Sequence, residues 1–411
     1  MIDLSSQEFW ALPPDEREES FAKLRADAPI SWQRQPEGAL MPEAEGSGGY
    51  WAVVRYDDVR TVSRDPETYR SGQGVMFEDI PEEMLEASQS FLAMDDPRHK
   101  TLRGLVAEGF KPREVKRIEN GIREDARTII DELDEGDADF VEGVAKRLPL
   151  MTIMRMLGVP EEDREHLVHH ADAAVSWNDP EYLAGRTPLE VVGEAMGVLH
   201  GAAAEIAADR RSSPRDDLIT ALVDAEVDGE RLTDFEIAAF FFLLSVAGND
   251  TTRHTTTHAA LALTRFPDQR AHLLADIEGR IDLAIEEFVR WASPVMTFRR
   301  TAARDTELAG QPIAAGDKVV MFYGSANRDE SAFAEPHAFD ITRDPNRHVG
   351  FGGGGPHFCM GAVMAKAQLR SIFTELLAAY PEFEVGEPRY IAGNFVNGIA
   401  ALPMGTGARA V

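Results

Sequence analysis

The stretch HVGFGGGGPHFCMG, residues 348–361, contains Cys359, the single cysteine of a chain of 411 residues. One cysteine cannot form an internal disulfide, so Cys359 is a buried spectator, a reactive thiol or a metal ligand. The run that follows it is rich in Ala, Leu, Met and Lys with apolar residues three and four apart, which predicts a helix beginning at or just beyond Cys359. The positive end of that helix would stabilise a thiolate.

The glycines before the thiol favour a metal-binding interpretation of this loop. They let the backbone turn tightly and bring amide groups close to the sulfur, and Gly361 leaves room for a flat group against the helix. Amide hydrogen bonds to a metal-bound sulfur tune its electron donation. The alternative is a buried free cysteine beside an ordinary glycine turn. Structural zinc is disfavoured, because it takes four ligands and usually several cysteines.

Composition limits the function classes. With 44% hydrophobic residues the chain can bury a sizeable core. The acidic, polar start lacks the pattern of a signal peptide, and we expect no membrane-spanning stretch of about 18 apolar residues. The 42 basic and 71 acidic side chains give a formal net charge of −29, which opposes binding to nucleic acid or anionic membrane. We therefore expect a cytoplasmic protein without a nucleic-acid or membrane partner.

The hydrophobic pattern predicts a mainly α fold with a small β region. Strand patterns occupy 29–35, 50–56, 297–308 and 318–322, with more near the C-terminus, whereas 63–89 is irregular and suited to carry binding residues. No repeat, linker or compositional boundary divides residues 1–411, so we expect one domain. A doubly wound α/β fold is excluded because strands and helices do not alternate. Helical patterns cover 14–28, 100–105, 114–133, 141–157, 189–208 and 235–266.

The predicted helix 235–266 turns polar in its middle. Ala247 and Gly248 remove bulk from one face, and the Thr251 hydroxyl can bond to the carbonyl one turn back, which bends helices. Asp250 adds an acid that is costly to bury unless it is paired. A gap, an acid and an alcohol together could hold a diatomic ligand and deliver protons to it. The alternative is a helix that crosses from core to surface at this point.

Two histidines follow on the same helix. His254 and His258 lie four residues apart and so share a face. That spacing occurs in metal sites, but a third ligand is missing from the pattern. We therefore expect both side chains to face solvent.

Two further charged pairs carry little information alone. Glu287 and Arg290 lie three apart on one helix face, where such surface pairs contribute only ~0.2–0.5 kcal/mol. His99 and Arg103 place two potential cations four apart, as on any solvated helix. Their order along the chain is more informative than either pair.

The ordered set of motifs resembles the cytochrome P-450 haem-thiolate monooxygenases. The motifs are HxxxR at 99–103, AGxDTT at 247–252, ExxR at 287–290, FDxxR at 339–343 and the glycine-rich cysteine loop, and the resemblance spans roughly residues 50–404. The segments 319–323 and 394–399 are similar to the bacterial subgroup that oxidises steroids and methyl-branched lipids. One departure is visible: Phe351 and Cys359 are separated by one residue more than in the commonest signature.

The resemblance implies a P-450 fold, a triangular prism with haem b between the long central helix and the helix of the cysteine loop. Cys359 would be the axial thiolate, with Phe351 packed near it and Gly361 beside the cofactor. Arg300 is preferred to Arg299 from its spacing to Asp305. Glu287, Arg290 and Arg343 would form a buried ion network that holds the loop. The propionates would be bound by His99, Arg103, Arg300 and His357.

The resemblance also implies the roles of the polar helix centre and of the pocket. Thr251 would hold dioxygen at the iron while Asp250 relays protons from solvent. The positions that usually contact substrate are all apolar in this chain, which indicates a hydrophobic substrate of moderate size. These residues are Val75, Met76, Phe77, Leu243, Val246, Ala247, Val295, Met296, Phe395 and Val396.

The function implied is hydroxylation of a steroid, methyl-branched lipid or terpenoid by a monomeric enzyme. Electrons would come from a ferredoxin and an NAD(P)H-dependent reductase, because the chain has no fused reductase domain. Residues 111–117 carry four basic and one acidic side chain and could dock an acidic ferredoxin. One alternative is a hydroxylase or epoxidase that tailors a polyketide or macrocycle. Another is a haem protein that only binds gas, which the Asp250–Thr251 pair opposes.

Overall fold

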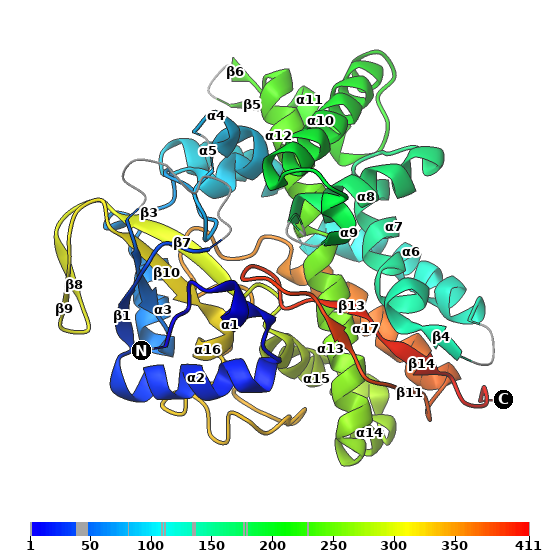
Figure 1. Ribbon diagram of the computed structural model, residues 1–411. Helices are drawn as coiled ribbons and strands as arrows, with labels where there is room; N and C mark the ends of the chain where they lie inside the picture. The colour runs from blue at the N-terminus through cyan, green and yellow to red at the C-terminus, as the bar shows by residue number, and fades with distance from the viewer. Residues whose placement is uncertain are drawn as a thin grey trace.

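The computed structural model describes residues 2–37, 48–80, 82–107, 110, 112–133, 137–175, 177, 180–227 and 230–410. A helical body occupies one side of the molecule and a β-rich region with the N-terminus occupies the other (Figure 1). The helices are α1 Gln7–Ala11, α2 Pro14–Asp27, α3 Tyr56–Arg64, α4 Glu82–Gln89, α5 Arg98–Ala107, α6 Pro112–Asp131, α7 Arg147–Met156, α8 Arg164–Val175, α9 Pro180–Leu183, α10 Pro188–Ser212, α11 Leu218–Asp224, α12 Asp234–Ala247, α13 Asp250–Arg265, α14 Pro267–Leu274, α15 Ile277–Ala292, α16 Tyr323–Ala326 and α17 Ala362–Ala379. Short turns of helix add η1 Ser90–Ala93, η3 Val141–Ala145 and η4 Glu161–Asp163.

The main sheet has five strands in the order β1-β2-β10-β7-β3. Only the β10–β2 pair is parallel, and the other three pairs are antiparallel. A second sheet has the order β11-β14-β4, and β12–β13, β5–β6 and β8–β9 form two-stranded pairs. The strands are β1 Ile30–Gln33, β2 Tyr50–Val53, β3 Tyr69–Arg70, β4 Asp137–Asp139, β5 Glu226–Val227, β6 Glu230–Arg231, β7 Thr297–Ala302, β8 Thr306–Leu308, β9 Gln311–Ile313, β10 Lys318–Phe322, β11 Glu384–Val385, β12 Arg389–Tyr390, β13 Ile399–Ala401 and β14 Pro403–Gly405.

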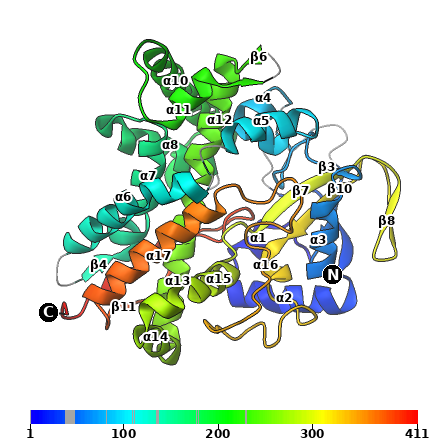
Figure 2. The same cartoon turned by 180° about the vertical axis from the view of Figure 1, so that it is seen from behind.

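Helix α13 runs through the centre of the molecule, with α17 and α15 beside it (Figures 1 and 2). One apolar cluster joins α6, α13, α15 and α17, and a second joins α8, α10 and α12. Because α13 is covered on several sides, its residues 252–263 are all buried. The mainly α fold with a small β region is as predicted.

Three expectations about the elements were wrong. The predicted helix 235–266 is two helices, because α12 ends at Ala247 and α13 begins at Asp250. The segment 63–89 is not wholly irregular, since α4 forms at its end. Helix α10 is long and apolar enough to cross a membrane, contrary to the expectation from composition. This helix packs against α8, α11 and α12, so the fold already accounts for its apolar residues.

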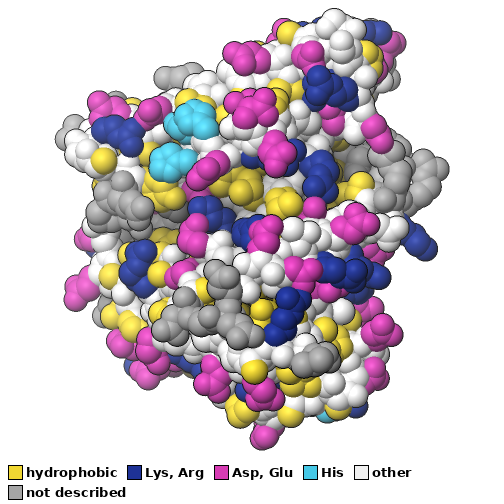
Figure 3. Space-filling view, turned by 90° about the vertical axis from the view of Figure 1, so that its right-hand side faces the viewer, with side chains coloured by type: hydrophobic (Ala, Val, Ile, Leu, Met, Phe, Trp, Pro, Cys, Tyr) yellow, Lys and Arg dark blue, Asp and Glu magenta, His cyan; other side chains and the backbone are white. Residues whose placement is uncertain are grey.

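Charged side chains of both signs are interspersed on the face shown in Figure 3. The excess of acidic residues in a chain of net charge −29 is therefore spread over that face and does not form a single patch. Charge that is dispersed in this way gives this face no directed attraction for one kind of partner.

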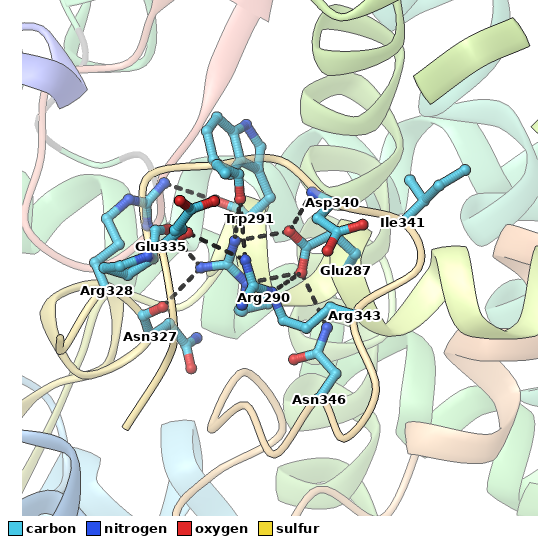
Figure 4. Close-up of polar contacts among 12 residues, drawn as sticks. Glu287, Arg290, Trp291, Asn327, Arg328, Glu335, Asp340, Ile341, Arg343 and Asn346 are labelled. Carbon is cyan, nitrogen blue, oxygen red and sulfur yellow. Dashed lines mark hydrogen bonds and ion pairs between the residues drawn. The ribbon is translucent and has the colours of Figure 1, made fainter. Parts of the chain in front are cut away.

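Glu287 and Arg290 form the centre of a buried ion network next to the cysteine loop (Figure 4). Arg290 Nε and Nη2 each donate to a Glu287 carboxylate oxygen at 2.7 Å, and both side chains are 0% exposed. The remaining Arg290 donors bond to the carbonyls of Asn327, Pro336 and Ala338. All five guanidinium N–H groups are thus used.

Glu287 also fixes the segment that leads into the cysteine loop. Its carboxylate accepts from the Asp340 backbone N–H at 2.9 Å and from Asn346 Nδ2 at 3.0 Å, and it lies 3.3 Å from Arg343 Nε. A buried charge left without its partner is strongly destabilising, so this network holds residues 327–346 against α15.

Replacing Glu287 by Gln should therefore lower the free energy of unfolding by roughly 3–5 kcal/mol, because Arg290 stays buried without a counter-charge. Urea denaturation followed by circular dichroism would measure this loss. The control is Glu375→Gln, which removes the partner of Arg127 in an exposed ion pair and should cost under about 1 kcal/mol. Equal effects of the two substitutions would contradict the assigned role of Glu287.

Candidate active site

Cys359 lies at the end of the glycine-rich loop, three residues before α17. Its backbone N–H donates to Phe351 O at 2.9 Å, which closes the loop. Cys359 is exposed to a cavity, and burial by the surrounding protein raises the pKa of its thiol. The N–H groups of Gly361 and Ala362 and the charge of Arg103 lower this pKa in part. Those groups would favour an anionic sulfur once it is ligated.

The loop glycines are required by contact with α3. A Cβ on Gly355, whose φ is +79°, would lie 2.2 Å from Ser63 O, and a Cβ on Gly353 would lie 2.5 Å from Ser63 Oγ. Gly354 has φ +95° and packs on Arg64, whose Nε donates to Gly353 O at 3.1 Å. Three consecutive glycines, Gly353 to Gly355, therefore let the loop lie directly on α3, where a side chain would overlap Ser63 or Arg64.

A cavity of about 1460 Å³, including the space at its mouth, opens in front of Cys359. Its lining combines the cysteine loop and α17 with the junction of α12 and α13 and the residues around Val295. Most of the lining is apolar, as in sites for hydrophobic ligands. Besides Cys359, the polar side chains of the lining are Arg103, Thr152, Thr251, Thr252, Thr255, Arg300, Tyr323, His357 and Gln368.

Cationic and imidazole side chains gather at one edge of this cavity. The ring centroids of His99 and His357 lie 4.1 Å apart. Burial, followed by the charge of Arg300, lowers the pKa of His357 to about 2, and burial also lowers the pKa of His99. Arg103 donates to Phe358 O, and Arg300 Nη1 donates to Arg299 O at 2.7 Å. Within the described residues neither of these two guanidinium groups forms an ion pair.

Two ring nitrogens in this cluster are buried without a hydrogen-bond partner, His99 Nε2 and His357 Nδ1. His357 Nε2 is held by Ser71 Oγ at 3.1 Å. Buried polar atoms without partners are rare, and here they accompany two unpaired guanidinium groups. The cluster therefore fits a ligand that carries carboxylates. Arg299 is directed elsewhere, to Asp79 at 2.6 Å, in keeping with the choice of Arg300.

The α12–α13 junction forms a further part of the cavity wall. A Cβ on Gly248 would lie 2.9 Å from Ile153, so the chain is closely packed where the helix breaks. The Thr251 hydroxyl donates to Ala247 O at 3.0 Å, the bond to the preceding turn expected from the sequence. Both Ala247 and Thr251 line the cavity, and so does Thr252.

Asp250 precedes Thr251 in the chain. Unlike Thr251, it does not line the cavity, and it is only 2% exposed. Its Oδ1 is 2.6 Å from Arg253 Nη2, in an alignment that leaves both carboxylate oxygens without a hydrogen bond. Burial is the main cause that raises the pKa of Asp250 to about 7, with Asp172 adding to the rise and Arg253 opposing it. An acid that titrates near neutrality is suited to passing protons.

The expectation that His254 and His258 face solvent was wrong. They are 0% and 6% exposed. His254 Nδ1 accepts from the Ile399 N–H at 3.3 Å, and His258 Nε2 lies 2.9 Å from Asn397 O. Burial lowers the pKa of both, to about 4 for His258, so they are neutral parts of the core. No cluster of three metal-ligating side chains exists among the described residues.

The predicted substrate contacts are dispersed. Leu243, Ala247 and Val295 line the cavity, and Phe395 packs on the lining residue Phe298 with ring centroids 5.7 Å apart. The other six lie behind this wall or in neighbouring core. Val396 pairs with Val295, Val246 packs on the α8–α10–α12 cluster, Val75 O accepts from Arg299 N, Met76 is half-buried, and Phe77 and Met296 belong to the cluster around Trp10.

Comparison with known proteins agrees with this geometry. A family model described as cytochrome P450 matches residues 189–389. A methyl-branched lipid omega-hydroxylase of Mycobacterium tuberculosis is 43% identical over 408 residues, covering 98% of this chain and 94% of that protein. The chain belongs to the cytochrome P450 family. A steroid C26-monooxygenase of Rhodococcus jostii is 40% identical over 390 residues, covering 93% and 80%.

The P450 fold is also shown by solved structures. A Mycobacterium marinum cytochrome P450 in complex with pseudoionone has a TM-score of 0.96 and 57% identity, covering 98% of each chain. P450 enzymes are haem-thiolate monooxygenases, so the cofactor of this chain is haem b. The site fits that group, since Cys359 offers the one thiol and the cavity offers the volume. The unpaired His99 and His357 nitrogens with Arg103 and Arg300 suit two propionates.

Several residues of this P450 site were missed from the sequence. Ser63 and Ser71 support the cysteine loop and His357, while Tyr323 and Gln368 line the cavity. Tyr323 stands at the end of a strand pattern, and that position was a usable signal. The two serines had no such signal, because their contacts are distant in the sequence: Ser71 and His357 are 286 residues apart.

Gly355→Ala should displace the cysteine loop and sharply reduce haem retention, because the new methyl group would overlap Ser63 O. Haem content per protein and thermal unfolding would measure the effect. Gly310→Ala is a matched control with φ +83° but nothing within 4 Å of the new Cβ. It should cost only the ~1–2 kcal/mol of a left-handed alanine and keep haem. Normal haem content in Gly355→Ala would show that close packing on α3 is dispensable.

Proposed function

We propose that this P450 hydroxylates a methyl-branched lipid, a steroid or a terpenoid, in one catalytic domain that comprises residues 1–411. The observation that carries the proposal is the cavity itself, in which Cys359, Thr251 and an apolar wall that includes Leu243, Val295 and Phe298 face the same space. The names of the relatives support the substrate class, since one acts on methyl-branched lipids and the other on steroids.

The proposed role of each residue follows from its position in the cavity. Bound haem with Cys359 as its thiolate would supply dioxygen activation and O–O cleavage. The Thr251 hydroxyl donates its hydrogen to Ala247 O, so its oxygen lone pairs remain free to accept a hydrogen bond in the cavity. Asp250, buried behind it, would hold the proton that the reaction consumes. The apolar wall excludes water and orients the substrate.

Electrons would come from a ferredoxin and an NAD(P)H-dependent reductase, acting on a cytoplasmic, monomeric enzyme. The basic segment 111–117 is the proposed docking surface. Lys111 and the side chains of Pro112, Arg113, Glu114, Val115 and Arg117 lie outside the described residues, and Lys116 is exposed. Charge steering by this segment would raise the association rate more than the affinity.

Carbon monoxide bound to the reduced enzyme should give the Soret position typical of thiolate ligation. Cys359→His should move the band to the position of a nitrogen ligand, because the anionic sulfur is lost. A difference spectrum measures both. An unchanged band in Cys359→His would exclude Cys359 as the ligand.

Thr251→Ala should lower product formed per NADH several-fold and raise hydrogen peroxide, because the hydrogen-bonding alcohol at the cavity is lost. Thr256→Ala is the control: Thr256 makes the same bond to the preceding turn, to Thr252 O at 2.9 Å, but is 2% exposed and away from the cavity lining. Thr252→Ala tests the neighbouring alcohol. Normal coupling in Thr251→Ala with loss in Thr252→Ala would transfer the role to Thr252.

The substrate class can be tested by the spin-state shift that follows displacement of water from the haem. A methyl-branched fatty acid, a steroid and a macrolide would be titrated in parallel. The proposal expects shifts with the first two. Shifts with macrolides alone would favour the alternative, tailoring of a polyketide or macrocycle.

A further inference from the structure

Four polar side chains form a closed cluster where α8 packs against the α12–α13 junction. They are Asp172, Asn249, Asp250 and Arg253, with exposures of 2%, 1%, 2% and 6%. Asp172 Oδ1 accepts from Asn249 Nδ2 at 3.0 Å, and its Oδ2 accepts from Arg253 Nη1 at 2.9 Å. Arg253 Nη2 lies 2.6 Å from Asp250 Oδ1. One guanidinium thus lies between two carboxyl groups from different helices.

The charges of this cluster do not balance. Two ionised carboxylates and one guanidinium leave a net charge of −1 in a buried space, which is costly. The charged or titratable groups around it change little: Lys146 acts on Asp250 from a distance, Tyr182 faces Arg253, and the adjacent His254 is neutral. One additional proton would make the cluster neutral.

The hydrogen bonds indicate where that proton lies. Both Asp172 oxygens already accept from donors, whereas both Asp250 oxygens have none. A hydrogen bond with Asp172 contributes to the raised pKa of Asp250, and two carboxyl groups can form such a bond only if one of them is protonated. A proton on Asp250 directed at Asp172 would complete the cluster.

We propose that Asp172, on α8, is a positioning residue that keeps a proton on Asp250 by sharing it, while Arg253 holds the two carboxyl groups together. The catalytic consequence rests on the proposed function: Asp250 would be loaded with a proton at neutral pH before turnover begins. The protonation itself does not depend on that function. Carboxyl pairs of this kind titrate together, so the apparent pKa belongs to the pair.

Infrared spectroscopy of the holoenzyme against pH would test this, since a protonated carboxyl has its own carbonyl band. In the unmodified protein the band should be lost as pH rises through about 7, because Asp250 ionises there. In Asp172→Asn the midpoint should fall by about one unit or more, because a negative neighbour becomes a neutral amide donor. In Arg253→Gln it should rise, because the stabilising cation is lost.

Controls separate this effect from general damage. Asp250→Asn assigns the band. Asp217→Asn alters another buried aspartate paired with an arginine, Arg210, and should leave the midpoint unchanged. Asp172→Ser is the replacement if the asparagine variant does not fold.

An unchanged midpoint in a folded Asp172 variant would overturn the proposal. Coupling of NADH use to product then gives a second readout. In Asp172→Asn coupling should decline at lower pH than in the unmodified enzyme, by the same shift as the infrared midpoint. A lowered infrared midpoint with coupling unaffected at every pH would leave the shared proton in place and remove Asp250 from proton delivery, so the two failures are distinguishable.

Discussion

The contact that the site depends on is backbone against backbone, where the glycine loop meets α3. Ser63 occupies the space that a side chain at Gly353 or Gly355 would need. The loop can therefore approach α3 this closely only with glycine at these two positions. That contact, with the Cys359 N–H bonded to Phe351 O, fixes where the sulfur enters the cavity.

Two buried charge clusters flank this site and differ in how completely they are satisfied. Around Glu287 and Arg290, all five guanidinium donors are used and the carboxylate accepts from several groups. Such a cluster is costly to alter and holds the loop rigidly. Around Arg253 two carboxyl groups face one guanidinium, and both Asp250 oxygens and Arg253 Nε have no hydrogen bond. A cluster that is one proton short of neutrality can gain and lose a proton. Such a cluster is better suited to proton transfer than to holding the loop in place.

The mainly α fold could be predicted from the sequence. Cys359 and Thr251 could be selected from it as well, because they belong to local motifs with fixed spacing, and both line one cavity. The sequence was insufficient where partners are distant in the chain. Nothing near Asp172 indicates that α8 packs on α13, and nothing near Ser71 indicates His357. His254 and His258 were assigned to solvent because helical spacing gives a shared face but not its surroundings. The helix ends at Ala247, where a Cβ on Gly248 would lie 2.9 Å from Ile153, and only the packed structure contains that proximity.

The predicted substrate contacts show that apolar residues of the cavity wall could not be distinguished from core residues in the sequence. Val295 lines the cavity while its neighbour Met296 lies in the core around Trp10, although both belong to one short apolar segment. Alternation along an extended chain sends adjacent side chains to opposite faces, and hydrophobicity alone does not distinguish a wall from a core. Polar residues are more informative, since each buried polar atom requires a partner. The unpaired atoms of His99, His357 and Asp250 therefore support the proposed positions of the propionates and of the proton more directly than the apolar lining supports any one substrate contact.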